Sequence, residues 1–445
     1  LNELIILNNL ELKKIFPKMN KTVNFIDQKL EIEFEKDNII VEGSGNLLLQ
    51  ENKDKINFFV NKKGGIYNFD TSFEINENLL NINFLNYKKT KENSALIKLK
   101  GKKELGKKTK FDLISFKEKN NIIEIQNLIL DKRFMLINLD GALIDILDKD
   151  ENFNKFKIIK KSKNNYHLDG SSFNADNLIK SLLDDDESPK ILNENFKIFI
   201  NIDKVLLDNK YNLSNLKGNL LVQNQEIING NLTGSFSNNK KLKFTVQSKD
   251  KEKITTLFSD KAEPIVNRYK FIKGFSGGVL DFYSSKQKDI SVSKLKIYDF
   301  KLKELPALTK LLTLASLQGI ADLVSGEGIG FDDFEMNFKN QKNVMTINEI
   351  YAIGPAISIL MDGYVEKNKL ISLRGTLVPA TTINKFIGSI PILGEILVGS
   401  KTGEGVFGVS FKIKGPPKNL ETNVNPIKTL TPRFITRTLE KIKKN

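Results

Sequence analysis

The segment "GVFGVSFKIKG", residues 405–415, decides the fold class of this chain. Apolar residues alternate along it with small or polar ones, so that Phe407, Val409, Phe411 and Ile413 are separated by Gly408, Ser410, Lys412 and Lys414. Successive side chains of a β-strand point to opposite faces of its sheet. The alternation therefore predicts a strand with one apolar face and one solvated face.

The same alternation recurs through most of the chain. It is clear at Leu80, Ile82 and Phe84, at Ile97 and Leu99, and at Leu242, Phe244 and Val246. Short polar segments separate the runs and have the composition of hairpin turns: "NKKGG" at 61–65, "NQKN" at 340–343 and "EKNK" at 366–369. The sequence thus predicts a mainly β fold, a long curled antiparallel β-sheet of repeated hairpins that resembles a groove.

A few short amphipathic helices are predicted between the strands. Their apolar periodicity places them near 172–183, where Asn174 is the expected cap, and near 259–272, 304–325 and 381–398. A basic helix is also expected from residue 432 to the C-terminus. Because glycine, alanine and apolar helices become frequent after residue 274, we expect a repetitive antiparallel β-region at 1–273 and a distinct module at 274–445.

The chain is strongly basic, with 69 Lys+Arg against 54 Asp+Glu and a net charge of +15. Most of these charges are lysines dispersed over strands and turns, whereas arginine, the side chain suited to bidentate phosphate and guanine contacts, is scarce. We therefore expect the lysines to lie on solvated sheet faces, with a membrane surface as the next interpretation and no nucleic-acid partner. No apolar segment reaches the ~20 residues of a membrane-spanning helix.

The residues that most catalytic and metal sites require are scarce. There is no cysteine and a single histidine, His167, so no thiolate, metal-binding histidine pair or histidine-activated nucleophile is expected. The acidic run at 184–187 lacks the alternating ligands of a calcium loop. The segment "GEILVGSKT" at 394–402 departs from a phosphate-binding loop, because Ser400 separates Gly399 from Lys401 and a strand follows. The sequence predicts no enzyme, no cofactor and no metal.

Six segments, in this order, carry a resemblance to a known family. They are "SGEGIGFD" (325–332), "GPAISILMDGYV" (354–365), "RGTLVPA" (374–380), "IPILGEIL" (390–397), "GEGVFGVSFKIKGP" (403–416) and "VNP" (424–426). Together they resemble the C-terminal region of the AsmA-like proteins, the superfamily that includes YhdP and TamB. The likeness begins near residue 259, where "SDKAEP" departs from the Asp-Ala-Gly sequence usual in the family. Upstream, only the repetitive β-pattern is similar.

The resemblance implies a non-enzymatic protein of the bacterial cell envelope. Such proteins are periplasmic and are tethered to the inner membrane by an N-terminal segment, which we expect to be missing here because the chain begins at Leu1. Their curled β-sheet is proposed to conduct phospholipid along an apolar groove between inner and outer membranes. The implied partners are phospholipid, a membrane surface and other envelope proteins. The alternative is a structural or assembly scaffold for outer-membrane biogenesis that transfers no lipid.

Elementary physics favours a groove independently of the family. A one-sided sheet must cover its apolar face with a second layer, a ligand or its own curvature, and few helices are predicted here. A closed β-sandwich or barrel filled by its own side chains is the alternative. The candidate lipid-groove residues are Phe334, Met336, Phe338, Leu373, Leu377, Phe407, Val409, Phe411 and Ile413; the sequence does not decide which strand face lines the groove.

The interrupted apolar segment within 381–398 has a separate candidate role. Its apolar residues are expected either to close the end of the groove or to contact a membrane interface, and packing on the last strands as core is the simpler interpretation. Glu395 must stay solvated in each case. The membrane-contact or end-cap candidates are Ile387, Ile390, Ile392, Leu393, Ile396 and Leu397.

Overall fold

The computed structural model describes residues 3–5, 12–183, 195–224, 226–268, 273–304, 328–379, 408–417 and 419–427. The chain forms two compact units, an N-terminal unit, Leu1–Asn238, and a C-terminal unit, Asn239–Asn445. The compositional change near residue 274 therefore lies inside the C-terminal unit, which also includes the two preceding strands.

In its described residues, the N-terminal unit is a succession of strands with two short helices and one 3-10 turn. Its elements are β1 (Glu3–Ile5), α1 (Leu12–Ile15), β2 (Thr22–Glu35), β3 (Asn38–Leu48), β4 (Asp54–Lys63), β5 (Ile66–Ile75), β6 (Leu80–Ile82), η2 (Asn83–Leu85), β7 (Tyr87–Lys89), β8 (Ala95–Glu104), β9 (Thr109–Glu118), β10 (Asn121–Leu130), β11 (Leu136–Asn138), β12 (Gly141–Leu147), β13 (Phe153–Ser162), β14 (Asn165–Asn174), α2 (Asp176–Leu183), β15 (Phe196–Leu206), β16 (Asn212–Gln223) and β17 (Glu226–Ser235).

The C-terminal unit follows the same plan with longer strands. The 3-10 turn η3 (Ser237–Asn239) lies at the boundary between the units. Beyond it come β18 (Lys241–Lys249), β19 (Glu252–Ser259), α3 (Glu263–Val266), β20 (Lys273–Gln287), β21 (Ile290–Glu304), β22 (Ile329–Gln341), β23 (Val344–Ile353), β24 (Ile357–Glu366), β25 (Leu370–Pro379), β26 (Gly408–Gly415) and β27 (Glu421–Ile427).

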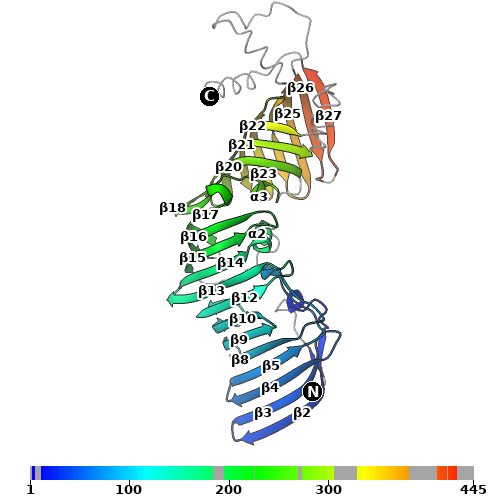
Figure 1. The fold of residues 1–445 in the computed structure, drawn as a ribbon, viewed down its shortest axis with the longest axis vertical. Coiled ribbons are helices and arrows are strands. Elements are labelled where there is room, and N and C mark those ends of the chain that lie inside the picture. The colour runs from blue at the N-terminus through cyan, green and yellow to red at the C-terminus, as the bar shows by residue number, and fades with distance from the viewer. Residues whose placement is uncertain are drawn as a thin grey trace, which may run out of the picture. The chain divides into compact units, whose positions relative to one another are not determined.

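Almost every strand pairs antiparallel with the next main strand of the chain, and Figure 1 shows β2 to β5 side by side in this order. The predicted turns are confirmed: residues 64–65 join β4 to β5, 342–343 join β22 to β23, and 367–369 join β24 to β25. Lys342 and Asn368 adopt the left-handed backbone conformation that such turns need. The mainly β class and the open, hairpin-built sheet are thus confirmed, and neither unit closes into a ring among its described strands.

One crossover breaks the antiparallel order that the sequence predicts. Strand β15 pairs parallel with β14, with His167 opposite Phe199, because α2 lies between the two strands and returns the chain to the same end of the sheet. Asn174 fixes the start of α2 as expected: its side-chain oxygen accepts from the Asp176 amide at 3.1 Å. Its amide group donates to the buried Asp148 carboxylate at 2.6 Å, which holds the crossover against the sheet.

The helix predictions have mixed outcomes. The helix expected at 172–183 is shorter, because residues up to Asn174 complete β14. Within 259–272 the described helix is a single turn, α3, since Ser259 ends β19; residues 269–272 lie outside the described residues. Apart from Glu304, which ends β21, the helices expected at 304–325, 381–398 and 432–445 also lie outside them.

Candidate functional site

Strand register aligns apolar side chains into continuous rows across the N-terminal unit. The row that we call the inner row is mostly buried, and each member is opposite the next on the neighbouring strand: Gly45, Ile56, Phe73, Ile97, Phe116, Ile123, Ile144, Phe156, Gly170, Ile202 and Leu216. Because side chains two residues apart share a face, a second row must run beside it.

This second row, which we call the open row, crosses every main strand from β2 to β17. Its members are Leu30, Gly43, Phe58, Thr71, Leu99, Ile114, Ile125, Ala142, Ile158, Leu168, Ile200, Gly218 and Leu232. All of them except Gly43 are partly or fully exposed. Neighbouring strands lie about 4.8 Å apart, so the open row covers roughly 60 Å of sheet.

The middle of the inner row, from Ile97 to Phe156, packs against the segment between β5 and β8, which we call the insert, residues 76–94. Leu80, Leu85 and Tyr87 of the insert are buried in one cluster with Phe116 and Ile144. The Tyr87 and Phe116 rings meet edge to face at 5.4 Å between centroids. The Tyr87 hydroxyl donates to the Glu118 carboxylate at 2.7 Å, and burial together with this carboxylate raises the tyrosine pKa.

Lys89 fastens the insert from inside. Its side chain is fully buried, and Nζ donates to the backbone carbonyls of Asn76, Asn78 and Thr90, the latter two at 2.9 Å. Burial lowers the pKa of this ammonium group, against the attraction of Asp54 and Glu118. Asp54 is also buried, which raises its pKa although Asn78 donates to it at 2.7 Å.

Residues on the opposite face of the same strands are largely charged or amide-bearing. Lys100 on β8 pairs with Asp70 on β5 at 3.2 Å, and Lys155 on β13 pairs with Asp145 on β12 at 2.7 Å. Exposed pairs of this kind contribute about 0–1 kcal/mol each. These ion pairs keep this face of the sheet hydrated, so the opposite face is the apolar one.

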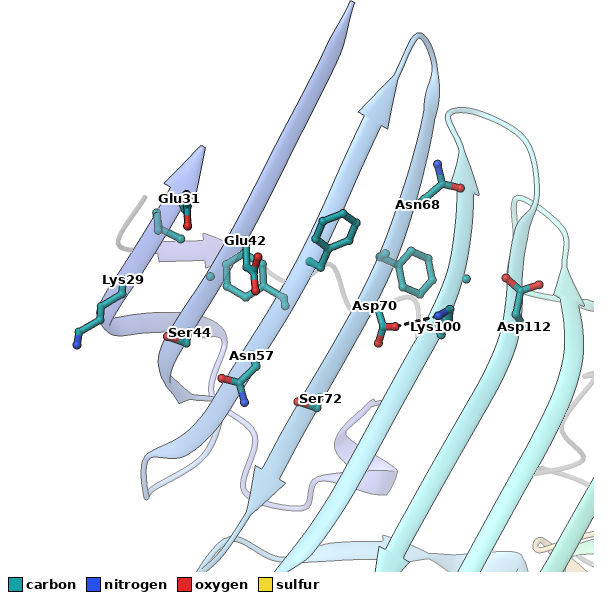
Figure 2. Close-up of a pocket in the computed structure, with 16 residues that line it drawn as sticks. Lys29, Glu31, Glu42, Ser44, Asn57, Asn68, Asp70, Ser72, Lys100 and Asp112 are labelled. Atoms are coloured by element: carbon teal, nitrogen blue, oxygen red, sulfur yellow. Dashed lines mark ion pairs between the residues drawn. The ribbon is translucent and has the colours of Figure 1, made fainter. Parts of the chain in front are cut away.

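A shallow hollow of about 880 Å³ lies over the first strands of the N-terminal unit. Figure 2 shows its polar side chains, which come from β2, β3, β4, β5, β8 and β9, with the ion pair between Asp70 and Lys100 marked. Glu31, Glu42, Asp70 and Asp112 outnumber Lys29 and Lys100 in its lining. The hollow is therefore locally acidic in a chain of net charge +15.

The C-terminal unit brings the described groove candidates onto one face. Strand register places Phe334 in a row with Leu377 and Val409, Met336 in the next row with Phe411, and Phe338 in a third row with Leu373 and Ile413. Leu377, Val409, Phe411 and Ile413 are buried, whereas the other four described candidates are partly exposed. Phe407 lies outside the described residues, as do all six end-cap candidates of 387–397.

Much of this face is filled by the unit's own side chains. Phe300 stacks between Phe275 and Phe331, with ring centroids 5.1 and 5.3 Å away. Ala262 and Val266, at the start and in the turn of α3, join the same buried cluster. Of the two units, the N-terminal one therefore shows the longer exposed apolar row.

The described residues hold no grouping suited to a metal ion. No cluster of three or more His, Cys, Asp or Glu side chains with metal-binding geometry occurs among them. His167 stacks against the Phe199 ring at 4.9 Å, a packing contact on the sheet. In the part of the chain that the structure describes, no helix has both the length and the apolar character to span a membrane. The acidic run at 184–187 lies outside this part.

The comparisons with known proteins leave the resemblance to AsmA-like proteins a prediction. No family model, no curated protein and no solved structure matches this chain.

The sequence patterns did not identify the open row or the insert as parts of a candidate site. Ile97 and Leu99 gave the correct face alternation, but alternation alone does not show which of two rows a neighbouring segment covers. One signal in the sequence could have indicated the insert. Most neighbouring strands are joined by short turns, whereas 76–94 is a long connection between β5 and β8, which pair with each other.

Proposed function

We propose that this chain is a non-enzymatic envelope protein that binds phospholipid acyl chains on the apolar sheet face and conducts them along it between membranes. The open row is the observation that supports the proposal, because its members from β2 to β17, except the buried Gly43, are partly or fully exposed and most of them are apolar. Soluble proteins rarely leave large contiguous apolar surfaces without a ligand or partner.

The energetics of such a path suit movement as well as binding. Each methylene group removed from water contributes about 0.8 kcal/mol, so a whole acyl chain is bound firmly although no single side chain dominates. The row repeats similar aliphatic side chains on most of its strands, for example Ile114, Ile125 and Ile158. A bound chain that shifts by one strand exchanges one such contact for another, which keeps the free-energy steps small.

The proposed partners and location follow from this function. The proposed partners are phospholipid, a membrane surface and other envelope proteins. The proposed compartment is the periplasm, where the protein is tethered to the inner membrane. The net charge of +15 gives the chain the sign that attracts anionic headgroups. The proposal requires no catalytic residue, cofactor or metal.

Recovery of lipid with the purified chain tests the proposal. We expect phospholipid to be extracted from the purified protein and identified by mass spectrometry. The double variant Ile125→Asp with Ile158→Asp places two carboxylates in the open row and should lower the recovered lipid at least tenfold, because an unpaired charge is costly in an apolar environment.

The matched control moves each substitution one residue along the same strand. Gln126→Asp with Lys157→Asp changes two exposed side chains on the polar face and should leave the lipid content unchanged. Because Ile125 and Ile158 pack partly buried against the core cluster, a cooperative melt is required of each variant before its lipid content is compared with that of the wild type. A wild-type protein that carries no lipid, but retains a protein partner, would instead support the scaffold function.

A further inference from the structure

A third row runs beside the open row in the N-terminal unit, on the side away from the inner row. We call it the outer row, and strand register joins its members from β3 to β10: Val41, Val60, Phe69, Gly101, Phe111 and Leu128. Except for the buried Gly101, they are partly exposed. The accessible apolar surface is therefore at least two rows wide on these strands.

Three polar side chains follow the outer row on the interior strands β4, β5 and β8, which lie side by side in Figure 1. Lys62 is opposite Tyr67, and Tyr67 is opposite Lys103; we call these three residues the rim. Because Lys62 is four residues from Phe58 and Lys103 is four residues from Leu99, the rim shares the face of the open row, about 13 Å from it along the strands.

The positive charges of the rim are held against rings. Lys62 Nζ lies 5.7 Å from the centre of the Tyr67 ring, and Lys103 Nζ lies 5.3 Å from the centre of the Phe134 ring. Lys103 Nζ also donates to Thr109 Oγ1 at 2.9 Å. Both lysines are partly buried, which removes part of the water that stabilises their charge.

No carboxylate neutralises the rim in the part of the chain that the structure describes. Neither Lys62 nor Lys103 forms an ion pair there. Glu104, the next residue after Lys103, points to the opposite face and pairs with Lys107 at 3.6 Å. Two partly buried ammonium groups without a counterion favour the binding of an anion.

The rim also has donors to offer such an anion. An ammonium group has three donors; among the described residues Lys103 uses one of them, and neither Lys62 nor the Tyr67 hydroxyl donates a hydrogen bond. The backbones of β4 and β8 are two strand spacings apart, about 10 Å. Flexible lysine side chains can therefore approach one phosphate group from both sides of Tyr67, and lysine binds phosphate as a point charge.

We propose that the rim binds the phosphate of an anionic phospholipid whose acyl chains lie on the outer and open rows. The adjoining apolar rows favour a lipid headgroup over free phosphate as the source of this group. The inference rests on the proposed lipid function and adds the class of headgroup. A headgroup with net negative charge is preferred to a zwitterionic one, because the positive charge of choline beside the phosphate is repelled by the two lysines.

Competition between two lipids for the full chain tests this inference. The protein is incubated with vesicles of phosphatidylglycerol and phosphatidylcholine in equal amounts, with identical acyl chains, and the lipid on the re-isolated protein is quantified by mass spectrometry. We expect bound phosphatidylglycerol to exceed bound phosphatidylcholine about tenfold. Excess inorganic phosphate should leave this ratio unchanged, because it has no acyl chain. If it displaces the phosphatidylglycerol, the rim is a site for free phosphate and the lipid assignment is wrong.

Two matched pairs of substitutions locate the preference. Lys62→Gln with Lys103→Gln removes both charges of the rim and should bring the ratio close to one, whereas the total bound lipid should stay the same because the apolar rows are intact. The control, Lys63→Gln with Lys102→Gln, makes the same charge change one residue away on the opposite face of β4 and β8 and should preserve the ratio. Tyr67→Phe keeps both charges but loses one donor, so it should lower the ratio part of the way.

The outcomes separate this inference from the proposed function. Equal binding of the two lipids to the wild type would overturn the inference and leave lipid binding in place. A preference that survives in the Lys62 and Lys103 variant would also overturn it, as would one that the control loses equally, because net charge would then be the cause. An unchanged ratio in Tyr67→Phe would contradict the contribution of the hydroxyl. Recovery of no lipid from the wild type would overturn both proposals.

Discussion

A single buried ammonium group, that of Lys89, joins the two ends of the insert to each other. Replacement by methionine keeps most of the apolar side chain but leaves the carbonyls of Asn76, Asn78 and Thr90 without their donor. A buried polar group without a partner costs about 1–3 kcal/mol. We expect Lys89→Met to lower the free energy of unfolding by about 2 kcal/mol in denaturant titration, whereas Lys88→Met, at the exposed neighbouring position, should change it little.

The same residue predicts a pH dependence of stability. Burial lowers the pKa of Lys89 in the folded chain below its ordinary value of 10.5. Between the lowered pKa and 10.5 the unfolded chain binds more protons than the folded chain, so the contribution of Lys89 to stability rises with pH. The stability difference between wild type and Lys89→Met should therefore widen as the pH approaches 10.5. If this stability difference stays constant over the pH range, the conclusion that Lys89 is buried and charged is contradicted.

Residue-scale features of this kind were beyond prediction from the sequence. The letters around Lys89 give a short alternation typical of an ordinary strand with exposed lysines. The burial of Lys89 depends on Asn76 and Thr90 coming together within the folded insert. Local propensity does not encode this tertiary arrangement. The Tyr87–Glu118 hydrogen bond likewise joins residues from separate elements.

At the scale of elements, the strands and turns were predictable because period-two alternation and turn residues are local signals. The parallel pairing of β14 and β15 was not, although the helix between them was expected, because a crossover depends on where the chain returns to the sheet. The sequence also left undecided which strand face lines the groove. Register shows that Phe334, Leu377 and Val409 share one face, because they are linked through successive strand pairs, and that this face lines a groove stays a prediction.

Strand β21 shows how strongly one element can anchor the C-terminal unit. Phe300 contacts Phe275 on β20 and Phe331 on β22, and its own exposure is small. We expect Phe300→Ala to cost about 4 kcal/mol of stability through lost burial and the cavity left behind. Lys301→Ala, one residue on and exposed, should cost less than about 0.5 kcal/mol. A loss below about 1 kcal/mol for Phe300→Ala would show that the aromatic stack is not a rigid core.

At the scale of the whole molecule, the repeated hairpins have a consequence that no single strand has. Each strand contributes one residue to a given row, and the register joins these residues into the inner and open rows of the N-terminal unit. The insert packs on the middle of the inner row, and most of the open row stays partly exposed beside it. A conduit differs from a binding pocket in this respect, because its ligand has many equivalent positions.

This difference between conduit and pocket gives a measurable prediction for the open row. A photoreactive phenylalanine analogue is placed singly at Phe58, Ile125 or Ile200, which lie on β4, β10 and β15. If phospholipid moves along the row, all three positions should crosslink to it with similar yield. The matched positions Asn57, Gln126 and Asn201, one residue away on the polar face, should crosslink at most a tenth as well. Crosslinking at one open-row position alone would mean a fixed lipid site, and crosslinking at none would remove the row from the function.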